Sequence, residues 1–322
     1  IRYVEVKPDN IIERGFQHFM IGAWSNALCA ITKDIDVALI FSPPLPLAWM
    51  ICLQGKLRRL PVVINIQDLF PREVIELGML KNRLLIWLFE RMERAVYRSA
   101  SSVTVHSPGN KEHVLSHGGK PGKVDVVYNW VNVDQIHPRQ RSNPFSQEYD
   151  LDKYFVVSYA GTMGWAQDMN TIVSCAQLLS NNPDILFLMV GEGVEKESAQ
   201  EKCKELGLNN VLWLPIQPLS VYPDVLASSD VSMINLHPEL RTPVVPSKLL
   251  SIMAAARPVV ASLPKESDAR LIITNAECGV IVDAGDCEAL AKAILKLKED
   301  KELADHMGRS GRAYVEANYS PD

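Results

Sequence analysis

Short apolar segments rich in β-branched residues alternate with longer segments of helical periodicity along the chain. This alternation is typical of parallel βαβ units, in which each buried strand is followed by a helix that packs on the sheet. The strands expected in the first half are residues 1–6, 37–41, 62–66, 103–106 and 124–128. Those expected in the second half are residues 155–160, 185–190, 211–214, 231–234, 259–262 and 279–282. The pattern predicts an α/β fold with parallel sheets, in which the same architecture occurs twice.

A polar, proline-containing stretch without clear periodicity separates the two series of strands. We expect it to be a linker over residues 136–152. The chain has 322 residues, whereas a domain usually takes roughly 100 to 200, so each series is long enough to bury its own core. The sequence therefore predicts an N-terminal domain at residues 1–135 and a C-terminal domain at residues 153–322.

The segment 84–97 is expected to form an amphipathic, basic helix, because its apolar residues recur at helical spacing and arginines occupy the remaining surface. The apolar positions are Leu85, Leu88, Phe89, Met92 and Val96, and the arginines are Arg83, Arg91, Arg94 and Arg98. Such a helix can pack on the core of its domain, or it can lie on an anionic membrane surface. The apolar run 44–53, which basic residues follow, leaves the same two interpretations open.

Composition narrows the class of protein. Hydrophobic residues make up 47% of the chain and charged residues 22%, values typical of globular proteins. The net charge of −5 and the absence of basic clusters interleaved with aromatic residues argue against nucleic acid as a partner. The six cysteines never approach a Cys-x-x-Cys spacing and are interpreted as reduced residues of a cytosolic protein. We expect a cytoplasmic protein whose contact with a membrane, where it occurs, is peripheral.

Two glycine-containing segments follow neighbouring predicted strands. Residues 159–164, YAGTMG, and residues 190–193, VGEG, both stand at strand ends. Glycines at such ends let the backbone approach a phosphate, and the carboxyl ends of neighbouring strands form the ligand-binding edge of an open α/β sheet. A tight strand-to-helix turn would explain either segment alone. The third glycine of the dinucleotide-binding fingerprint is absent.

The segment Pro243 to Ala261 contains a third candidate for phosphate binding. Ser247 is expected to be the N-cap of a helix, and Lys248 falls in its first turn, where a cation is unfavourable unless an anion is bound. The buried stripe of this helix is expected to be Leu249, Ile252, Met253 and Ala256. The alternative is a solvated lysine on a capped helix.

Taken in order, these motifs resemble the donor-binding domain of family-four retaining glycosyltransferases of the GT-B fold. The segments that carry the resemblance are YAGTMG, VGEG, WLPIQP, ASSDVSMI and PSKLLSIMAAARPVVAS. In the first half, NIQDLFPREVIELG and SSVTVHSPG resemble the family's acceptor domain. The chain is most similar to the bacterial envelope-polysaccharide enzymes of this family, of the colanic-acid, O-antigen or capsule type. The resemblance implies two facing Rossmann-like domains with parallel sheets, the first of them incomplete.

The resemblance also implies a set of site residues. Phosphate contacts are expected at the glycine turns and the Pro-Ser-Lys helix, with the nucleotide base near the end of strand 211–214. The donor-binding candidates are Gly161, Thr162, Met163, Gly164, Gly191, Gly193, Trp213, Leu214, Pro215, Ser247, Lys248, Leu249 and Ser251. Asp68, with Glu73 as a weaker companion, and Glu239 are the catalytic candidates. The alternatives are a turn or capping role for Asp68 and a solvated surface position for Glu239.

The chain departs from the family pattern in several places. Relatives commonly carry a Glu-x7-Glu pair that contacts the sugar and the ribose, and the aligned positions here are Pro243 and Ser251. The usual glycine before Arg257 is Ala256. We also expect the family's N-terminal strand with its glycine-rich loop, and its last helix, to be missing from this chain.

The expected activity is transfer of a sugar from a nucleotide-sugar, with UDP as the expected nucleotide, to a lipid-linked saccharide in bacterial surface polysaccharide synthesis. The nucleotide-sugar is a substrate, and no cofactor is expected. A metal ion is not expected either, because no Asp-x-Asp pair ends a strand, and His106, His113 and His117 are interpreted as surface or turn residues. Two alternatives remain open: a nucleotide-sugar 2-epimerase on the same scaffold, and a truncated or inactive nucleotide-binding module.

Overall fold

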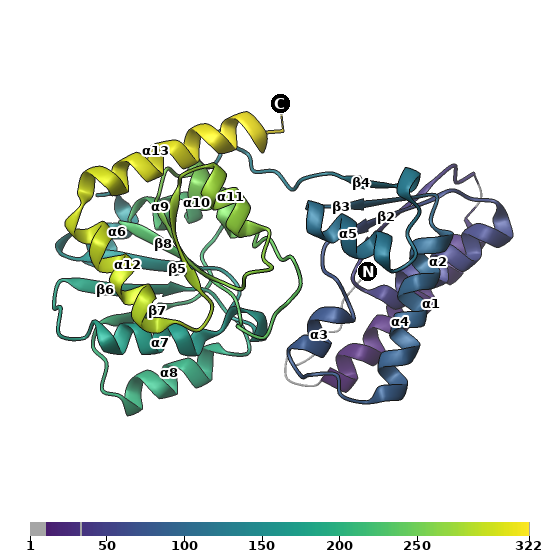
Figure 1. The fold of residues 1–322 in the computed structure, drawn as a ribbon, viewed down its shortest axis with the longest axis horizontal. Coiled ribbons are helices and arrows are strands. Elements are labelled where there is room, and N and C mark those ends of the chain that lie inside the picture. The colour runs from purple at the N-terminus through teal and green to yellow at the C-terminus, as the bar shows by residue number, and fades with distance from the viewer. Residues whose placement is uncertain (1–10, 33, 322) are drawn as a thin grey trace. The chain divides into compact units, whose positions relative to one another are not determined.

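The computed structural model describes residues 11–32 and 34–321, so the strand expected at residues 1–6 lies outside the described residues. The chain divides into two compact units. The first unit comprises Ile1–Tyr128 together with Arg241–Val244, and the second comprises Asn129–Leu240 and Val245–Asp322. Each unit contains one parallel sheet with helices packed on it (Figure 1).

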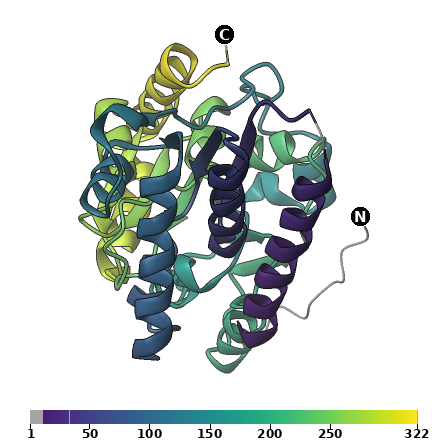
Figure 2. The same cartoon turned by 90° about the vertical axis from the view of Figure 1, so that its right-hand side faces the viewer.

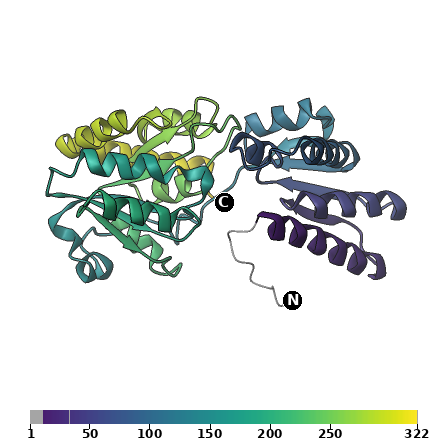
Figure 3. The same cartoon turned by 90° about the horizontal axis from the view of Figure 1, so that it is seen from below.

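The first unit contains a four-stranded parallel sheet in the order β1-β2-β3-β4. Its strands are β1 (Ala38–Ser42), β2 (Val62–Ile66), β3 (Ser102–Val105) and β4 (Val124–Val126). Its helices are α1 (Ile11–Ile31), α2 (Leu45–Arg58), α3 (Arg72–Glu76), α4 (Arg83–Ser99) and α5 (Pro108–Ser116). Figure 2 shows α1, α2 and α4 as a row of neighbouring helices, and Figure 3 shows α1 outside α2.

Helix α4 confirms the amphipathic helix expected at residues 84–97. It begins after Asn82, whose side-chain oxygen accepts hydrogen bonds from the backbone N–H groups of Leu84 and Leu85. The apolar stripe is buried only toward its end, at Met92 and Val96. Leu85 and Leu88, which belong to the expected stripe, are instead exposed, as are Leu84 and Trp87 beside them. The first two turns of α4 therefore present apolar side chains to solvent.

The second unit contains a six-stranded parallel sheet in the order β10-β9-β8-β5-β6-β7. Its strands are β5 (Phe155–Ala160), β6 (Ile185–Val190), β7 (Val211–Leu214), β8 (Val231–Asn235), β9 (Val259–Leu263) and β10 (Gly279–Asp283). Alternate residues of β5 and β6 enter two different cores, as the pleat requires. Val157, Tyr159 and Phe187 pack in one core with α7 (Met169–Leu178), α8 (Lys196–Glu205), α12 (Cys287–Glu299) and α13 (Lys301–Asn318). Val156 and Leu188 pack in the other with α6 (Pro144–Glu148) and α9 (Tyr222–Ala227). The remaining helices are α10 (Lys248–Ala254) and α11 (Ala269–Asn275).

This strand order is that of the doubly wound nucleotide-binding fold. Counted from β5, the order across the sheet is 3-2-1-4-5-6, which reverses between β5 and β8. Ligands of open α/β sheets bind at the carboxyl ends of the strands on either side of such a reversal. The segments that follow β5 and β8 therefore define where a ligand of this unit is expected.

The residues expected to form a linker contain ordered structure in the second unit. Helix α6 lies within residues 136–152, where Asn143 and Ser146 cap it reciprocally. The guanidinium of Arg312 in α13 donates hydrogen bonds to the carbonyl oxygens of Val133 and Ile136, which precede α6, and to that of Ala254. These contacts tie residues 133–136 to the second unit, and the second unit begins at Asn129.

Candidate functional site

The first glycine turn follows β5 at the reversal of strand order. Gly161 has a φ of 142°, a conformation that L side chains rarely adopt. The N–H groups of Gly161, Met163 and Gly164 donate to Val190, Glu192 and the side chain of Gln167, respectively, at 2.9, 2.9 and 3.0 Å. Within the described part of the chain, the N–H of Thr162 makes no hydrogen bond. Of the four turn N–H groups expected to face phosphates, only this one is available to a ligand in this conformation.

The second glycine turn packs directly on the first. A Cβ atom on Gly191 would lie 1.9 Å from the carbonyl oxygen of Gly161, and one on Gly193 would lie 2.1 Å from that of Met163. Both distances are far below van der Waals contact, so no side chain fits at either position. The close approach of the two backbone turns thus explains why residues 191 and 193 are glycines, and their contact with a ligand stays a prediction.

Lys248 lies behind the first glycine turn. Its Nζ atom is 3.6 Å from the centroid of the Tyr159 ring, and a Cβ atom on Gly161 would lie 3.1 Å from its Cε and Nζ atoms. The ammonium is buried and, among the described residues, has no hydrogen-bond acceptor. Burial lowers the pKa of Lys248 to about 7. A buried ammonium without an acceptor is costly, and an anion at this place would satisfy it.

The neighbours of Lys248 differ in part from the sequence expectation. Ser247 precedes α10 as expected, but its side chain makes no capping hydrogen bond and is exposed. Leu249 is fully buried, so its side chain belongs to the core and cannot line a ligand site. Ser251 interacts with the hydroxyl of Tyr222 in α9. Because α10 is only seven residues long, the electrostatic case for anion binding rests on Lys248 rather than on the helix.

The expected base-binding segment lies at the end of the edge strand β7. Trp213 packs against the core beneath α7 and α8, and Leu214 is buried in the opposite core. Pro215 and Ile216 follow the strand and are exposed. The structure therefore leaves Pro215 and Ile216 accessible to a ligand, whereas Trp213 and Leu214 support the strand from within.

The first unit brings together three titratable residues at the carboxyl end of its sheet. Asp68 follows β2, His106 follows the adjacent strand β3, and Glu73 lies in α3. Burial raises the pKa of Asp68, and the nearby His106 opposes this effect. Burial, and then the charge of Asp68, raise the pKa of Glu73 to about 7. The carboxylate of Glu73 also accepts a hydrogen bond from the N–H of Leu69 at 3.0 Å.

His106 was missed by the sequence reasoning, which interpreted it as a surface or turn residue. It is buried, and its Nδ1 atom lies 3.5 Å from the carbonyl oxygen of Ile66 and 3.2 Å from the side-chain nitrogen of Asn110. The pairing of β2 with β3 brings it beside Asp68, because adjacent parallel strands end at the same edge, and this pairing is known only from the structure. Glu239, the other catalytic candidate, is exposed in the turn after β8.

The fold and the site define a two-unit α/β protein whose second unit is of the Rossmann type. The chain matches the family described as glycosyl transferases group 1 over residues 141–314, and the glycosyl transferase 4-like domain over residues 15–130. The chain belongs to the glycosyl transferases group 1 family. None of the described helices is long and apolar enough to cross a bilayer.

The similar proteins agree with this family. The chain is 25% identical over 327 residues to the probable glycosyltransferase WbjE of Pseudomonas aeruginosa, covering 99% of this chain and 80% of that protein. It is 23% identical to the putative colanic acid biosynthesis glycosyl transferase WcaI of Escherichia coli, covering 75% of this chain and 61% of that protein. Among solved structures, HepE of Anabaena in complex with UDP has a TM-score of 0.76 at 17% identity, covering 94% and 78% of the two chains. Sucrose-phosphate synthase of Thermosynechococcus elongatus has a TM-score of 0.77, also at 17% identity, covering 98% and 77%. These likenesses confirm the expected GT-B fold.

Proposed function

We propose that this protein transfers a glycosyl group from a nucleoside diphosphate sugar, with UDP as the nucleotide, to a saccharide acceptor in surface polysaccharide synthesis. The observation that carries the proposal is the buried ammonium of Lys248, which lacks an acceptor at the reversal of strand order. A diphosphate supplies the charge that this ammonium needs. UDP complexes of the structurally similar HepE, and the polysaccharide-related names of the relatives, support the choice of ligand and pathway.

In the proposed reaction, the bond between the sugar's C1 and the diphosphate oxygen breaks, the oxygen of an acceptor hydroxyl bonds to C1, and that hydroxyl gives up its proton to a base. Negative charge grows on the leaving phosphate. The ammonium of Lys248 and the N–H of Thr162 would stabilise that charge without a metal ion, and such preorganised electrostatic stabilisation can be the largest catalytic effect. We propose retention of configuration at C1, as the family resemblance implies. Three groups at the acceptor side would accept protons from sugar hydroxyls or donate protons to them: the carboxyl groups of Asp68 and Glu73 and the imidazole of His106.

We further propose that the acceptor is lipid-linked and is reached from the inner face of the membrane. The start of α4 supports this, because Leu84 and Trp87 are 70% and 53% exposed and the guanidinium of Arg91 lies 5.1 Å from the Trp87 ring centroid. Apolar side chains beside arginines favour an anionic lipid surface. In sedimentation with anionic vesicles at low salt, the chain should pellet, and a Leu84→Gln, Trp87→Gln double variant should not. Leu178→Gln, at an exposed leucine of the second unit, is the control.

Turnover assays separate the proposal from its rivals. The chain is incubated with UDP-sugars, with and without lipid-linked saccharides extracted from a polysaccharide-producing bacterium, and UDP release and sugar identity are followed. Acceptor-dependent UDP release supports the transferase. Conversion of the sugar to its 2-epimer without an acceptor would favour the epimerase, and UDP binding without any turnover would favour a binding module.

A further inference from the structure

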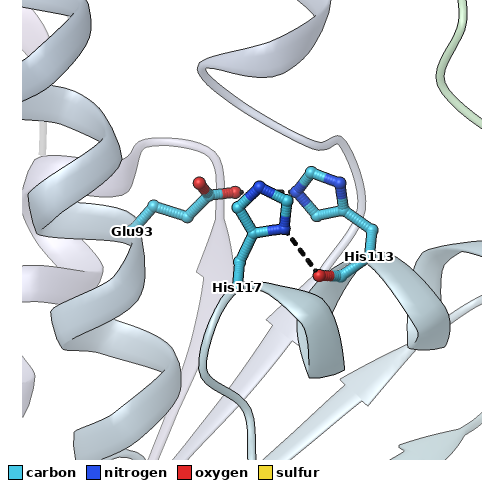
Figure 4. Close-up of side chains that lie close together, drawn as sticks. All are labelled: Glu93, His113 and His117. Carbon is cyan, nitrogen blue, oxygen red and sulfur yellow. Dashed lines mark hydrogen bonds and ion pairs between the residues drawn. The ribbon is translucent and has the colours of Figure 1, made fainter.

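Helices α4 and α5 of the first unit bring one carboxylate and two imidazoles together. Each of Glu93, His113 and His117 offers a ligand atom, and these atoms lie within 4.8 Å of one another. Figure 4 shows the Glu93 carboxylate reaching from α4 toward the two histidines. The Glu93 Oε1 atom is 3.0 Å from His113 Nε2. Sequence reasoning interpreted both histidines as surface or turn residues, and the side chain of His113 is only 12% exposed.

The spacing of the histidines follows from the helix. Residues four apart in a helix lie on the same face, so His113 and His117 at the end of α5 stack, with ring centroids 4.0 Å apart and planes inclined by 16°. The same spacing places two zinc ligands on one helical face in other proteins. The last turn of a helix also carries partial negative charge on its free carbonyl groups, which favours a cation there.

Neighbouring groups orient His117 and Glu93 for metal binding. The Nδ1 atom of His117 lies 2.9 Å from the carbonyl oxygen of His113. Because a carbonyl oxygen only accepts, Nδ1 carries the proton, and the lone pair of His117 is on Nε2. The hydroxyl of Tyr97 donates to Glu93 Oε1 at 3.0 Å and orients the carboxylate. Metal-binding histidines and carboxylates are commonly fixed by such outer hydrogen bonds.

We propose that Glu93, His113 and His117 form a binding site for a divalent transition metal ion of the Zn²⁺ type, with water as a further ligand. Two imidazoles and a carboxylate are a ligand set that suits Zn²⁺. Ligands of one Zn²⁺ lie roughly 3.3 Å apart in a tetrahedral site, so small rotations of the side chains are enough to close this group around an ion. The site lies wholly within the first unit and joins α4 to α5.

The alternative to a metal ion at this site is a proton on His113. Protonation of His113 would also compensate the charge of Glu93, which is 2% exposed. That arrangement needs one imidazole and leaves the Nε2 lone pair of His117 without a role. A metal ion uses both imidazoles, which is why the geometry favours it.

The test is a titration of the tag-free chain, stripped of metal with a chelator, by Zn²⁺ in a calorimeter and by Co²⁺ in a spectrophotometer. We expect one equivalent of Zn²⁺ to bind and Co²⁺ to give the intense visible absorption of a four-coordinate site. His117→Gln and Glu93→Gln should each weaken binding at least tenfold, and Tyr97→Phe by roughly tenfold with the stoichiometry retained. Zn²⁺ should raise the melting temperature of the parent and not that of His117→Gln.

The matched control is His137→Gln. His137 also directs Nδ1 to a backbone carbonyl oxygen, that of Asp134 at 2.8 Å, but it is exposed and belongs to no such cluster within the described residues. This variant should bind Zn²⁺ like the parent. Absence of stoichiometric binding to the parent, or His117→Gln binding as tightly as the parent, would overturn the proposal. The Co²⁺ spectrum of the parent decides the question even where a substitution prevents folding, because octahedral weak absorption would equally exclude the site.

Discussion

Replacement of Lys248 by methionine should strengthen the fold and weaken nucleotide binding at once. Methionine keeps an unbranched side chain that reaches as far as the Cε atom of lysine, but it removes the charged Nζ. In the protein without ligand, the Lys248 ammonium is buried without a hydrogen-bond acceptor among the described residues, so its removal relieves a cost of folding. In the presence of a diphosphate the same ammonium is a binding group. Ordinary core substitutions lower stability and function together. A gain in stability combined with a loss of nucleotide affinity is therefore diagnostic of the role of Lys248.

The magnitude follows from the pKa of Lys248, which burial lowers from 10.5 to about 7. Each pH unit between the folded and unfolded pKa is worth about 1.4 kcal/mol, so at pH 7 the cost is about 4 kcal/mol. Between pH 7 and 10.5 the unfolded chain binds more protons than the folded one, so the stability of the parent rises with pH in this window. The advantage of Lys248→Met should therefore be largest at or below pH 7 and vanish toward pH 10.5.

Urea denaturation at pH 7 and 9.5 measures the first effect, and calorimetry with UDP at pH 7 measures the second. Loss of a buried charged partner costs about 2–4 kcal/mol, so UDP affinity should fall roughly 30-fold to 1,000-fold. Lys202→Met is the control, because Lys202 in α8 has a hydrogen-bond acceptor in Asn170 at 3.0 Å. The reasoning is refuted if Lys248→Met binds UDP like the parent, or if its stability at pH 7 does not exceed that of the parent.

Three further substitutions test other parts of the structure by urea denaturation. Gly191→Ala should lower the free energy of unfolding by about 3 kcal/mol or more, because the new Cβ would meet the Gly161 carbonyl oxygen at 1.9 Å. Gly207→Ala is the control: its Cβ would meet nothing within 4 Å, so it should cost only about 1 kcal/mol for its positive φ. Equal costs would contradict the close packing of the turns. Glu73→Gln should raise the free energy of unfolding by about 2 kcal/mol above pH 7 and by little below pH 4.5. The reason is that the raised pKa of Glu73, about 7, makes the parent lose stability as pH rises between these values. A gain in stability that does not depend on pH would show that the carboxylate is not the cause. Ala256→Gly should add about 1 kcal/mol, because residue 256 has a φ of 52°, and a loss of stability would show that this strain is negligible.

The strands were predictable from sequence because each is a short apolar run buried on both faces by helices. In the second unit, β5, β6 and β8 have fully or largely buried residues throughout, which is why their apolar runs are unbroken. The order of the strands across the sheet could not be predicted from the sequence in the same way. The reversal between β5 and β8 depends on which strands pair, and no local pattern encodes that pairing.

A residue of the candidate site could be predicted from the sequence only where its residue type had a single physical explanation at that position. Lys248 drew attention because a cation is unfavourable at the start of a helix, and the structure adds its burial. Gly191 has the same sequence signature as a phosphate-binding glycine, but the close approach of Gly161 is a tertiary contact that the motif does not reveal. Two helices and a strand separate Asp68 from His106 in sequence, so their proximity also required the fold.

Gly161 and Lys248 belong to one arrangement, although they stand in different motifs. Any side chain at residue 161 would press on the Cε and Nζ atoms of Lys248 at 3.1 Å, so the glycine creates the space that the ammonium occupies. The Tyr159 ring lies 3.6 Å from the Lys248 Nζ atom, and its hydroxyl donates to the carbonyl oxygen of Thr162 at 2.5 Å. The ring is thereby fixed to the turn that it supports. The lysine is thus held beside the turn by packing and by its contact with the Tyr159 ring rather than by hydrogen bonds, which leaves N–H donors of its ammonium for an anion.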